Sequence, residues 1–229
     1  MAAPDSRGID WTRDCAAVIP CFNEAPTIAT VVSNVQIYLT TVLVVDDGST
    51  DDTGARSSAA GATVLRNPLN RGKGSALRIG LNHAHAQGFT WALTLDGDGQ
   101  HLATDIPVFF VCAEKTSASL VVGNRLGAAQ KIPPLRRAVN RLMTKLLSRL
   151  TKTPLADSQC GFRLINLAAW AKLPLTTDHF ETESECLVQF LRAGHRVEFV
   201  PIHVIYHSST SKIRPLLDAW RWLRWWLAQ

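Results

Sequence analysis

The chain has 229 residues, and 46% of them are hydrophobic, which is enough to bury the core of a single α/β domain. A formal net charge of +5 favours anionic partners such as a nucleotide, a lipid phosphate or a membrane surface, and nucleic acid is not expected among them. The five cysteines are scattered and form no C-x-x-C pair, so they predict reduced thiols rather than disulfides or a zinc site. No signal peptide is recognisable before Cys15, and no apolar run reaches about 18 residues, so no membrane span is expected.

Short apolar runs that predict strands alternate along the chain with stretches that predict helices. After a flexible, polar lead-in over residues 1–13, strands are expected at 15–20, 41–45, 63–65, 91–95, 120–123, 162–166 and 196–206. Helices are expected from about 26 and 53, and over 74–86, 104–115, 135–150 and 183–193. This alternation predicts a mostly parallel sheet flanked by helices, in which ligands bind beyond the carboxyl ends of the strands. The loops that carry Pro20, Asp46 and Asp96 are therefore expected to share one crevice.

Two carboxylates separated by one glycine follow the strand expected at 91–95, in the sequence L-D-G-D-G-Q-H. In an extended chain Asp96, Asp98 and Gln100 would point to the same side, so that three oxygen donors converge. Such a set suits Mg²⁺ or Mn²⁺, whose remaining ligands usually include substrate phosphates. The same residues are also good turn formers, and the tetrapeptide alone does not decide between the two interpretations. A calcium loop of the EF-hand type is excluded, because His101 and Pro107 occupy the positions of its glycine and its glutamate.

Glycines also punctuate the loop from Asn67 to Ser75, which reads N-P-L-N-R-G-K-G-S. It is not a P-loop, because Asn67 stands where the first glycine is required and Gly74 follows the lysine. The G-x-G-x-x-G dinucleotide fingerprint is absent after the first strand as well. Arg71 and Lys73 are either phosphate contacts or solvated basic residues that precede a helix.

Four motifs, in this order, resemble those of the inverting nucleotide-sugar glycosyltransferases of family 2. They are V-I-P-C-F-N-E (18–24), V-V-D-D-G-S-T-D-D-T (44–53), N-R-G-K-G (70–74) and L-D-G-D-G-Q-H (95–101). Three more resemble the branch that charges polyprenyl phosphates, similar to dolichyl-phosphate mannose synthase: G-N-R (123–125), D-S-Q-C-G-F-R (157–163) and S-K-I-R-P (211–215). The resemblance covers nearly the whole chain, from Val18 to about Pro215. It implies the GT-A fold, a single Rossmann-like domain that we expect over residues 14–212.

The resemblance also implies roles for individual residues. The nucleotide would be held by Pro20, Phe22, Glu24, Asp46, Asp47 and Asp96. Asp96, Asp98 and Gln100 would hold Mg²⁺ or Mn²⁺ together with the donor diphosphate, and the expected catalytic residues are Asp96, Asp98 and Arg125. A divalent cation at this position can neutralise the charge that develops on the leaving phosphate without a proton donor.

An acceptor that is a lipid phosphate is already anionic, so it needs positioning by arginines more than deprotonation. The helix expected over 135–150 is amphipathic and basic, and it supplies several candidates. The residues expected to contact the acceptor phosphate are Arg125, Arg136 with Asn140 (or Arg137 with Arg141 as the alternative register), and Lys212. In relatives with sugar acceptors a carboxylate in this part of the chain acts as the base, and Glu183 is the nearest candidate by position.

The last segment, residues 213–229, carries four of the seven tryptophans, interleaved with leucines and arginines. This composition predicts an amphipathic helix that rests in the headgroup layer of a membrane, where a polyprenyl substrate would be met. A helix that packs on the core or contacts a second copy is the alternative. We therefore expect a cytoplasmic protein peripheral to the membrane, with a membrane protein or a second copy of the chain as a further partner.

Together these features predict a metal-dependent inverting glycosyltransferase that moves a hexose from GDP-mannose or a UDP-hexose to a polyprenyl phosphate. The first alternative is the same fold acting on a glycan or another acceptor without a phosphate. A nucleotidyltransferase is disfavoured, because the usual glycine-rich entry loop is missing after the first strand. A catalytically silent membrane-associated scaffold is disfavoured, because all three expected metal ligands are present.

Overall fold

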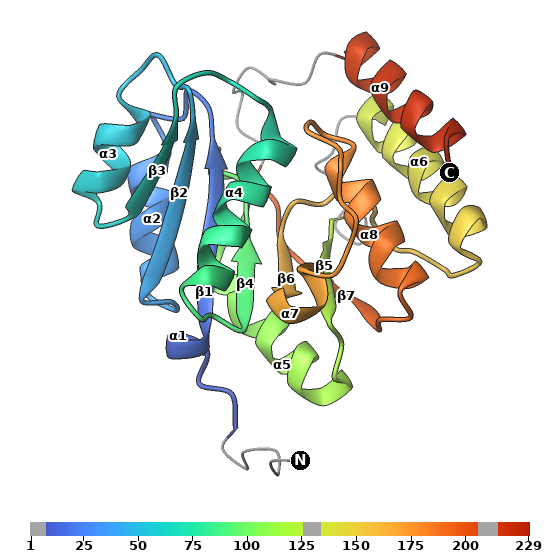
Figure 1. The fold of residues 1–229 in the computed structure, drawn as a ribbon, viewed down its shortest axis with the longest axis horizontal. Coiled ribbons are helices and arrows are strands. Elements are labelled where there is room, and N and C mark those ends of the chain that lie inside the picture. Colours follow the sequence, from blue (N-terminus) through green and yellow to red (C-terminus); the bar gives the residue numbers. More distant parts are fainter. Residues whose placement is uncertain (1–7, 126–133, 206–214) are drawn as a thin grey trace.

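The described part of the chain contains one seven-stranded sheet with the strand order β3-β2-β1-β4-β6-β5-β7 (Figure 1). The computed structural model describes residues 8–125, 134–205 and 215–229. Neighbouring strands are parallel except at β6, which runs antiparallel to both β4 and β5. The strands are β1 (Cys15–Cys21), β2 (Thr41–Asp47), β3 (Thr63–Asn67), β4 (Trp91–Thr94), β5 (Leu120–Asn124), β6 (Arg163–Asn166) and β7 (Val197–Pro201). The predicted single α/β domain with a mostly parallel sheet is thus confirmed.

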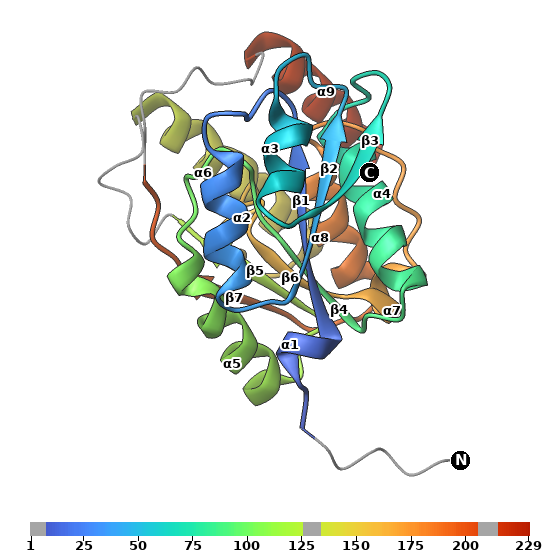
Figure 2. The ribbon, with the colours of Figure 1, turned by 90° about the vertical axis from the view of Figure 1, so that its left-hand side faces the viewer.

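Helices cover both faces of the sheet: α4 lies on one face, whereas α2 and α5 lie on the other (Figure 2). The helices are α1 (Trp11–Asp14), α2 (Ile28–Gln36), α3 (Thr53–Ala59), α4 (Lys73–Ala86), α5 (Ile106–Thr116), α6 (Pro134–Thr151), α7 (Leu167–Trp170), α8 (Thr182–Arg192) and α9 (Pro215–Leu227), with a short 3₁₀ turn over Ala103–Asp105. Helix α4 packs closely on the sheet because it carries Gly80, where an added Cβ would lie 2.4 Å from Val18 Cγ1. The sheet is therefore fully covered at its centre, which explains why its strands are continuous apolar runs.

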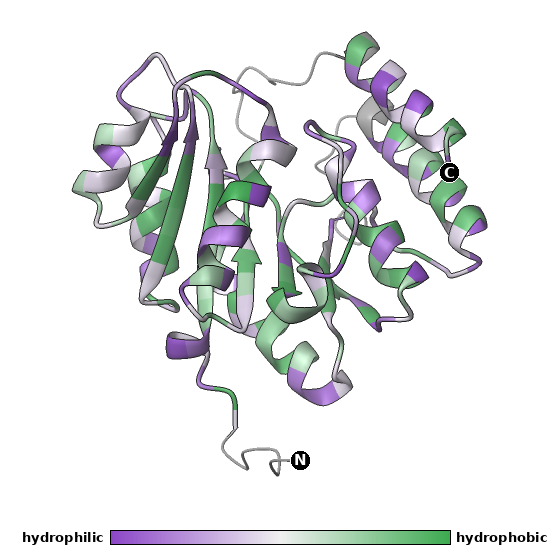
Figure 3. Ribbon diagram, viewed as in Figure 1, coloured by the Kyte–Doolittle hydropathy of each residue, from purple (hydrophilic) through white to green (hydrophobic). Residues whose placement is uncertain are grey.

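The central strands are apolar on both faces, and hydrophobic colouring follows β1, β2 and β4 in Figure 3. All residues of β1 except Pro20 are buried, and so are all four residues of β4. Burial on both faces leaves their carboxyl ends as the places where polar side chains meet solvent. The loops after β1, β2 and β4 consequently lie at one edge of the sheet, as the sequence predicts.

Two segments differ from the expected elements. Ordered structure begins before Cys15, because α1 places Trp11 in a stacked contact with Phe110, with ring centroids 4.4 Å apart. The last strand is shorter than predicted and ends at Pro201, since the chain then turns away and forms only an isolated bridge between Val204 and His101. This bridge ties the segment after β7 to the acidic turn that follows β4.

Helix α9 packs against α6 and α8 in a second apolar cluster, formed around the buried side chains of Leu147, Val188 and Trp222. The sequence left open whether α9 rests on a membrane or packs on the protein. The side of α9 that carries Trp222 packs on the protein. The other side exposes large apolar residues, with Trp220 at 55% and Leu227 at 70% exposure. Among the helices that the structure describes, none is both long and apolar enough to cross a membrane.

Candidate active site

The loops after β1 and β2 are locked together by hydrogen bonds around Asn23. This residue has a positive φ of 54°, which an asparagine tolerates well. Its backbone N–H donates to Ser49 Oγ at 3.0 Å, and its side-chain oxygen accepts from Thr50 N at 2.8 Å. Glu24 N donates to Thr53 Oγ1 at 2.7 Å. The expected nucleotide contacts Pro20, Phe22 and Glu24 are all half-buried here, and their contact with a nucleotide stays a prediction.

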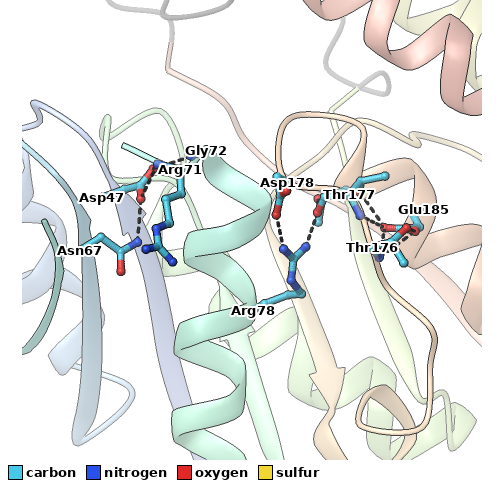
Figure 4. A network of polar contacts seen from close by, with 10 residues as sticks. Asp47, Asn67, Arg71, Gly72, Arg78, Thr176, Thr177, Asp178 and Glu185 are labelled. Atoms are coloured by element: carbon cyan, nitrogen blue, oxygen red, sulfur yellow. Dashed lines mark hydrogen bonds and ion pairs between the residues drawn. The ribbon is translucent and has the colours of Figure 1, made fainter. Parts of the chain in front are cut away.

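Asp46 and Asp47, at the end of β2, are buried and organise loops. Asp47 accepts from Asn67 Nδ2 at 2.7 Å and from the backbone N–H groups of Arg71 and Gly72 at 3.0 and 2.8 Å (Figure 4). Asp46 Oδ1 accepts from Ser49 N at 2.9 Å. Asp46 thus fixes the loop that follows β2, and Asp47 fixes the loop that follows β3. Each carboxylate therefore stabilises a loop conformation at this edge of the sheet. A direct nucleoside contact by either one stays a prediction.

Lys73 is, with Arg71, one of the two basic residues whose role the sequence left open. It begins α4, and its ammonium lies 2.5 Å from Asp96 Oδ1 and 2.7 Å from Glu183 Oε1. Burial alone would lower the pKa of Lys73, but the two carboxylates outweigh it and raise that pKa above its ordinary value. A Cβ at Gly161 would lie 2.9 Å from Lys73 Nζ, so this glycine of the 157–163 motif makes room for the ion pairs. Three distant motifs therefore meet at one ammonium group.

The acidic segment after β4 is a turn, and the prediction of an extended chain from Asp96 to Gln100 is wrong. Gly99 has a φ of +74°, and Gln100 N donates to Asp98 Oδ1 at 3.0 Å. The turn is held at both sides, since Thr27 Oγ1 donates to Gly97 O at 2.7 Å and Ile205 N donates to Gln100 O at 2.9 Å. The turn-forming interpretation is correct, and it still leaves two carboxylates close to each other.

The two carboxylates of this turn have opposite pKa shifts. Burial would raise the pKa of Asp96, but Lys73 and His101 hold it well below its usual range. Burial, and after it the neighbouring negative charge of Asp96, raise the pKa of Asp98. Within the described residues no group of three His, Cys, Asp or Glu side chains has the arrangement of a metal site. The binding of a divalent cation by Asp96, Asp98 and Gln100, with the substrate completing its shell, stays a prediction.

Glu183 and Glu185, both at the start of α8, have different roles. Glu183 faces Lys73, whereas Glu185 accepts from the backbone N–H groups of Thr176 and Thr177 at 3.0 and 2.9 Å (Figure 4). The loop that Glu185 holds in turn binds the start of α4, where Gly74 N donates to Asp178 O at 2.8 Å. Arg78 pairs with Asp178 as well and donates to the Thr177 carbonyl (Figure 4). This explains the glycine after Lys73, because a Cβ at that position would lie 2.0 Å from Thr182 Oγ1.

Arg125, expected as a phosphate ligand, lies at the end of β5 and forms a bidentate pair with Asp157. Its Nε and Nη2 atoms are 2.8 and 3.0 Å from the two carboxylate oxygens. Burial would raise the pKa of Asp157, but Arg125 outweighs it and the pKa is lowered. Asp157 was not identified as a site residue from sequence, although it opens the D-S-Q-C-G-F-R motif. A role of Arg125 toward a phosphate stays a prediction.

The face of α6 that carries Thr144 is turned toward this pair. Thr144 Oγ1 lies 3.0 Å from the Oγ of Ser158, the residue that follows Asp157 in the chain. Arg137 is half-buried and precedes Thr144 by two helical turns on the same face, and Asn140, also half-buried, flanks it. Arg141, the partner of Arg137 in the alternative register, is exposed. The Arg136 side chain and Lys212 lie outside the described residues.

A mostly parallel sheet with acidic loops gathered at the carboxyl ends of β1, β2 and β4 is the architecture of the GT-A glycosyltransferases. Residues 16–173 match the family model described as Glycosyl transferase family 2. The match covers more than half of the chain, so the chain belongs to this family of enzymes.

Curated relatives and a solved structure agree with this assignment. A UDP-N-acetylglucosamine–dolichyl-phosphate N-acetylglucosaminyltransferase of Methanococcus voltae is 30% identical in an alignment 215 residues long that covers 82% of this chain and 84% of the relative. A dolichyl-phosphate beta-glucosyltransferase of Saccharomyces cerevisiae is 25% identical in an alignment 221 residues long that covers 82% of this chain and 65% of the relative. The structure of Mycobacterium tuberculosis glucosyl-3-phosphoglycerate synthase with Mn²⁺, uridine diphosphate and phosphoglyceric acid matches with a TM-score of 0.72 at 24% identity, covering 94% of this chain and 76% of that one. At that identity, the structural likeness shows the fold.

Proposed function

We propose that the chain is a metal-dependent inverting glycosyltransferase that moves a hexose from a nucleotide sugar, GDP-mannose or a UDP-hexose, to a polyprenyl phosphate. The observation that carries the proposal is the meeting of Lys73, Asp96 and Glu183, which come from three distant segments of the chain, at the carboxyl edge of the sheet. Dolichyl phosphate appears in the names of both relatives described above, which supports a lipid phosphate as acceptor.

On the donor side, Asp96, Asp98 and Gln100 would hold Mg²⁺ or Mn²⁺ beside the diphosphate. The proximity of the Asp96 and Asp98 carboxylates within one turn supports this assignment, as does the presence of Mn²⁺ and uridine diphosphate in the mycobacterial structure. When bound, the cation would neutralise the negative charge that develops on the leaving diphosphate. Pro20, Phe22, Glu24, Asp46 and Asp47 frame the nucleoside in this proposal.

Lys73 supplies a fixed positive charge between the donor turn and α8. Because Glu183 Oε1 is bound to the Lys73 ammonium, Glu183 acts first as the partner that orients this lysine. An anionic phosphate acceptor needs no base, and this arrangement suits it. Glu183 becomes the candidate base only if the acceptor is a sugar hydroxyl.

On the acceptor side, we propose that Arg125 and Arg137 contact the lipid phosphate, with Asn140 beside them. Arg136 and Lys212 remain candidates from sequence. The exposed side of α9, which includes Trp220, would rest on the membrane surface and bring the site to its lipid substrate. In this proposal the protein works at the cytoplasmic face, peripheral to the membrane.

Sugar transfer with a panel of acceptors tests the proposal. The purified protein with Mn²⁺ is incubated with UDP-glucose, UDP-N-acetylglucosamine or GDP-mannose, each with a polyprenyl phosphate in detergent, phosphoglyceric acid or a simple glycan. We expect one nucleotide sugar to glycosylate the polyprenyl phosphate alone. Transfer only to phosphoglyceric acid or to the glycan would refute the acceptor and favour the alternative of the same fold with another acceptor.

A further inference from the structure

Trp222 connects helix α9 to the interior of the domain. Of positions 217–229 it alone is buried, at 6% exposure. Its indole N–H donates to Ser184 Oγ at 2.8 Å. Ser184 lies in the first turn of α8 and is fully buried, one residue after Glu183. Helix α9 is therefore held on α8 by this hydrogen bond as well as by apolar packing, and the hydrogen bond lies next to Glu183.

From Ser184 the contacts continue to Arg125. The Gln159 side-chain amide donates to the same Ser184 Oγ at 2.7 Å, and the Gln159 backbone N–H donates to Asp157 Oδ1 at 3.0 Å. Asp157 is fully buried and holds Arg125 through both of its carboxylate oxygens. The chain of contacts thus runs from Trp222 through Ser184, Gln159 and Asp157 to Arg125. Trp222, Ser184 and Asp157 are buried, whereas Gln159 and Arg125 are half-buried, and each hydrogen bond between them is directional.

A neighbouring tryptophan shows that packing on α9 does not by itself require this hydrogen bond. Trp226 stacks beside Trp222, with ring centroids 6.3 Å apart and an angle of 9° between the planes. Its Nε1 is buried but has no hydrogen-bond partner among the described residues. The helix therefore carries two similar rings, and Trp222 differs from Trp226 in donating its N–H to Ser184.

We propose that Trp222 is a positioning residue for the acceptor side of the site. Its N–H fixes the Ser184 hydroxyl, which orients the Gln159 amide and thereby the segment 157–160 that holds Arg125. The contacts of the donor side do not involve the indole N–H, because the Glu183 side chain is bound to Lys73. The Glu183 carbonyl accepts from Arg163 Nη1 at 2.7 Å, and the same guanidinium donates to the carbonyls of Ser158 and Cys160, so Arg163 holds the segment 157–160 independently of Trp222. This inference rests on the proposed role of Arg125 toward the acceptor phosphate.

The kinetic test compares Trp222→Phe with Trp226→Phe, which removes an indole N–H that makes no hydrogen bond with the described residues. With a polyprenyl phosphate acceptor, Trp222→Phe should lower kcat/KM for the acceptor by roughly three- to tenfold, the effect of one lost hydrogen bond. The affinity for the nucleotide sugar should stay within about twofold of the wild type, because the donor side keeps its contacts. Trp226→Phe should leave both quantities unchanged. Equal effects of the two variants, or an equal loss for donor and acceptor, would overturn the proposal.

A second measurement does not depend on activity. In hydrogen–deuterium exchange under conditions where all variants are folded, peptides covering 157–163 should exchange faster in Trp222→Phe than in wild type or Trp226→Phe. The double variant Trp222→Phe with Ser184→Ala should exchange no faster than Ser184→Ala, because both changes break the same connection. If the wild type transfers sugar to no acceptor, the proposed function fails while exchange still tests the connection. Unchanged exchange in Trp222→Phe would overturn the connection itself.

Discussion

Replacement of Lys73 by methionine tests the ion pairs at the centre of the site. Asp96 Oδ1 and Glu183 Oε1 lie 2.5 and 2.7 Å from the same Lys73 ammonium nitrogen, so the two oxygens are at most about 5 Å from each other. Without the lysine, two negative charges at this separation repel by about 3 kcal/mol at an effective dielectric constant of about 20. The Asp96 side chain is 30% exposed, and solvent screening reduces that repulsion. We expect Lys73→Met to lower the free energy of unfolding by about 2–3 kcal/mol.

Urea unfolding followed by tryptophan fluorescence measures this loss, and a decrease of about 4–12 °C in Tm should accompany it. Lys172→Met, at an exposed lysine, is the matched control and should be neutral. The pH dependence identifies the cause. In the wild type the lowered pKa of Asp96 keeps its stabilising charge throughout pH 5–8, and that contribution is lost only as the pH falls through the lowered pKa. In the variant one of the two carboxylates takes up a proton as the pH falls, so the penalty should be smaller at pH 5 than at pH 8. A neutral substitution, or a penalty independent of pH, would refute the role assigned to Lys73.

Three further predictions follow from the contacts of single residues. Asp47→Ala removes the acceptor of the Arg71 and Gly72 backbone N–H groups and should lower the free energy of unfolding by about 1–3 kcal/mol, measured by urea unfolding. Asp52→Ala is the control and should leave that free energy unchanged, because Asp52 is exposed and its side chain makes no capping hydrogen bond. Because Arg125 lowers the pKa of Asp157 in the folded state, that pair stabilises above pH ~4, and the contribution is lost as the pH falls through the lowered pKa. Acid titration of the free energy of unfolding should therefore show a shallower decline in Asp157→Asn, and identical acid slopes would contradict this. Cys112 is half-buried while the other four cysteines are buried, so a thiol reagent should label Cys112 first in the native protein, and rapid labelling of a second thiol would be inconsistent with the packing.

Much of the fold could be predicted because the signals are local and regular. The apolar runs that form β1, β2 and β4 end in polar loops, and that pattern correctly predicted that these loops lie at one edge of the sheet. The geometry of the acidic segment could not be predicted from strand periodicity, because Gly99 takes a positive φ and turns the chain. The motifs correctly predicted the family. They did not predict which residues of different motifs contact one another.

The partners of the charged residues were the least predictable part of the site. Glu183 is more than one hundred residues from Lys73, and the pair forms only because α4 and α8 meet beside β4. Likewise, Asp157 reaches Arg125 through the return of the chain after α6. Long-range ion pairs of this kind depend on the packing of whole elements, and no local pattern encodes them. The packing of Trp222 on α8 was similarly open, since an amphipathic helix can bury its apolar side against protein or lipid.

The most direct test of the proposed function is transfer of a labelled sugar to a polyprenyl phosphate by the wild type and by Asp98→Asn, each with Mn²⁺ and with EDTA. Asp98→Asn is chosen because the side chain keeps its size while losing the charge that would hold the cation. The proposal predicts Mn²⁺-dependent transfer by the wild type and a loss of at least about two orders of magnitude in the variant. Transfer that persists in EDTA, or an Asp98→Asn variant as active as the wild type, would contradict the metal-dependent mechanism.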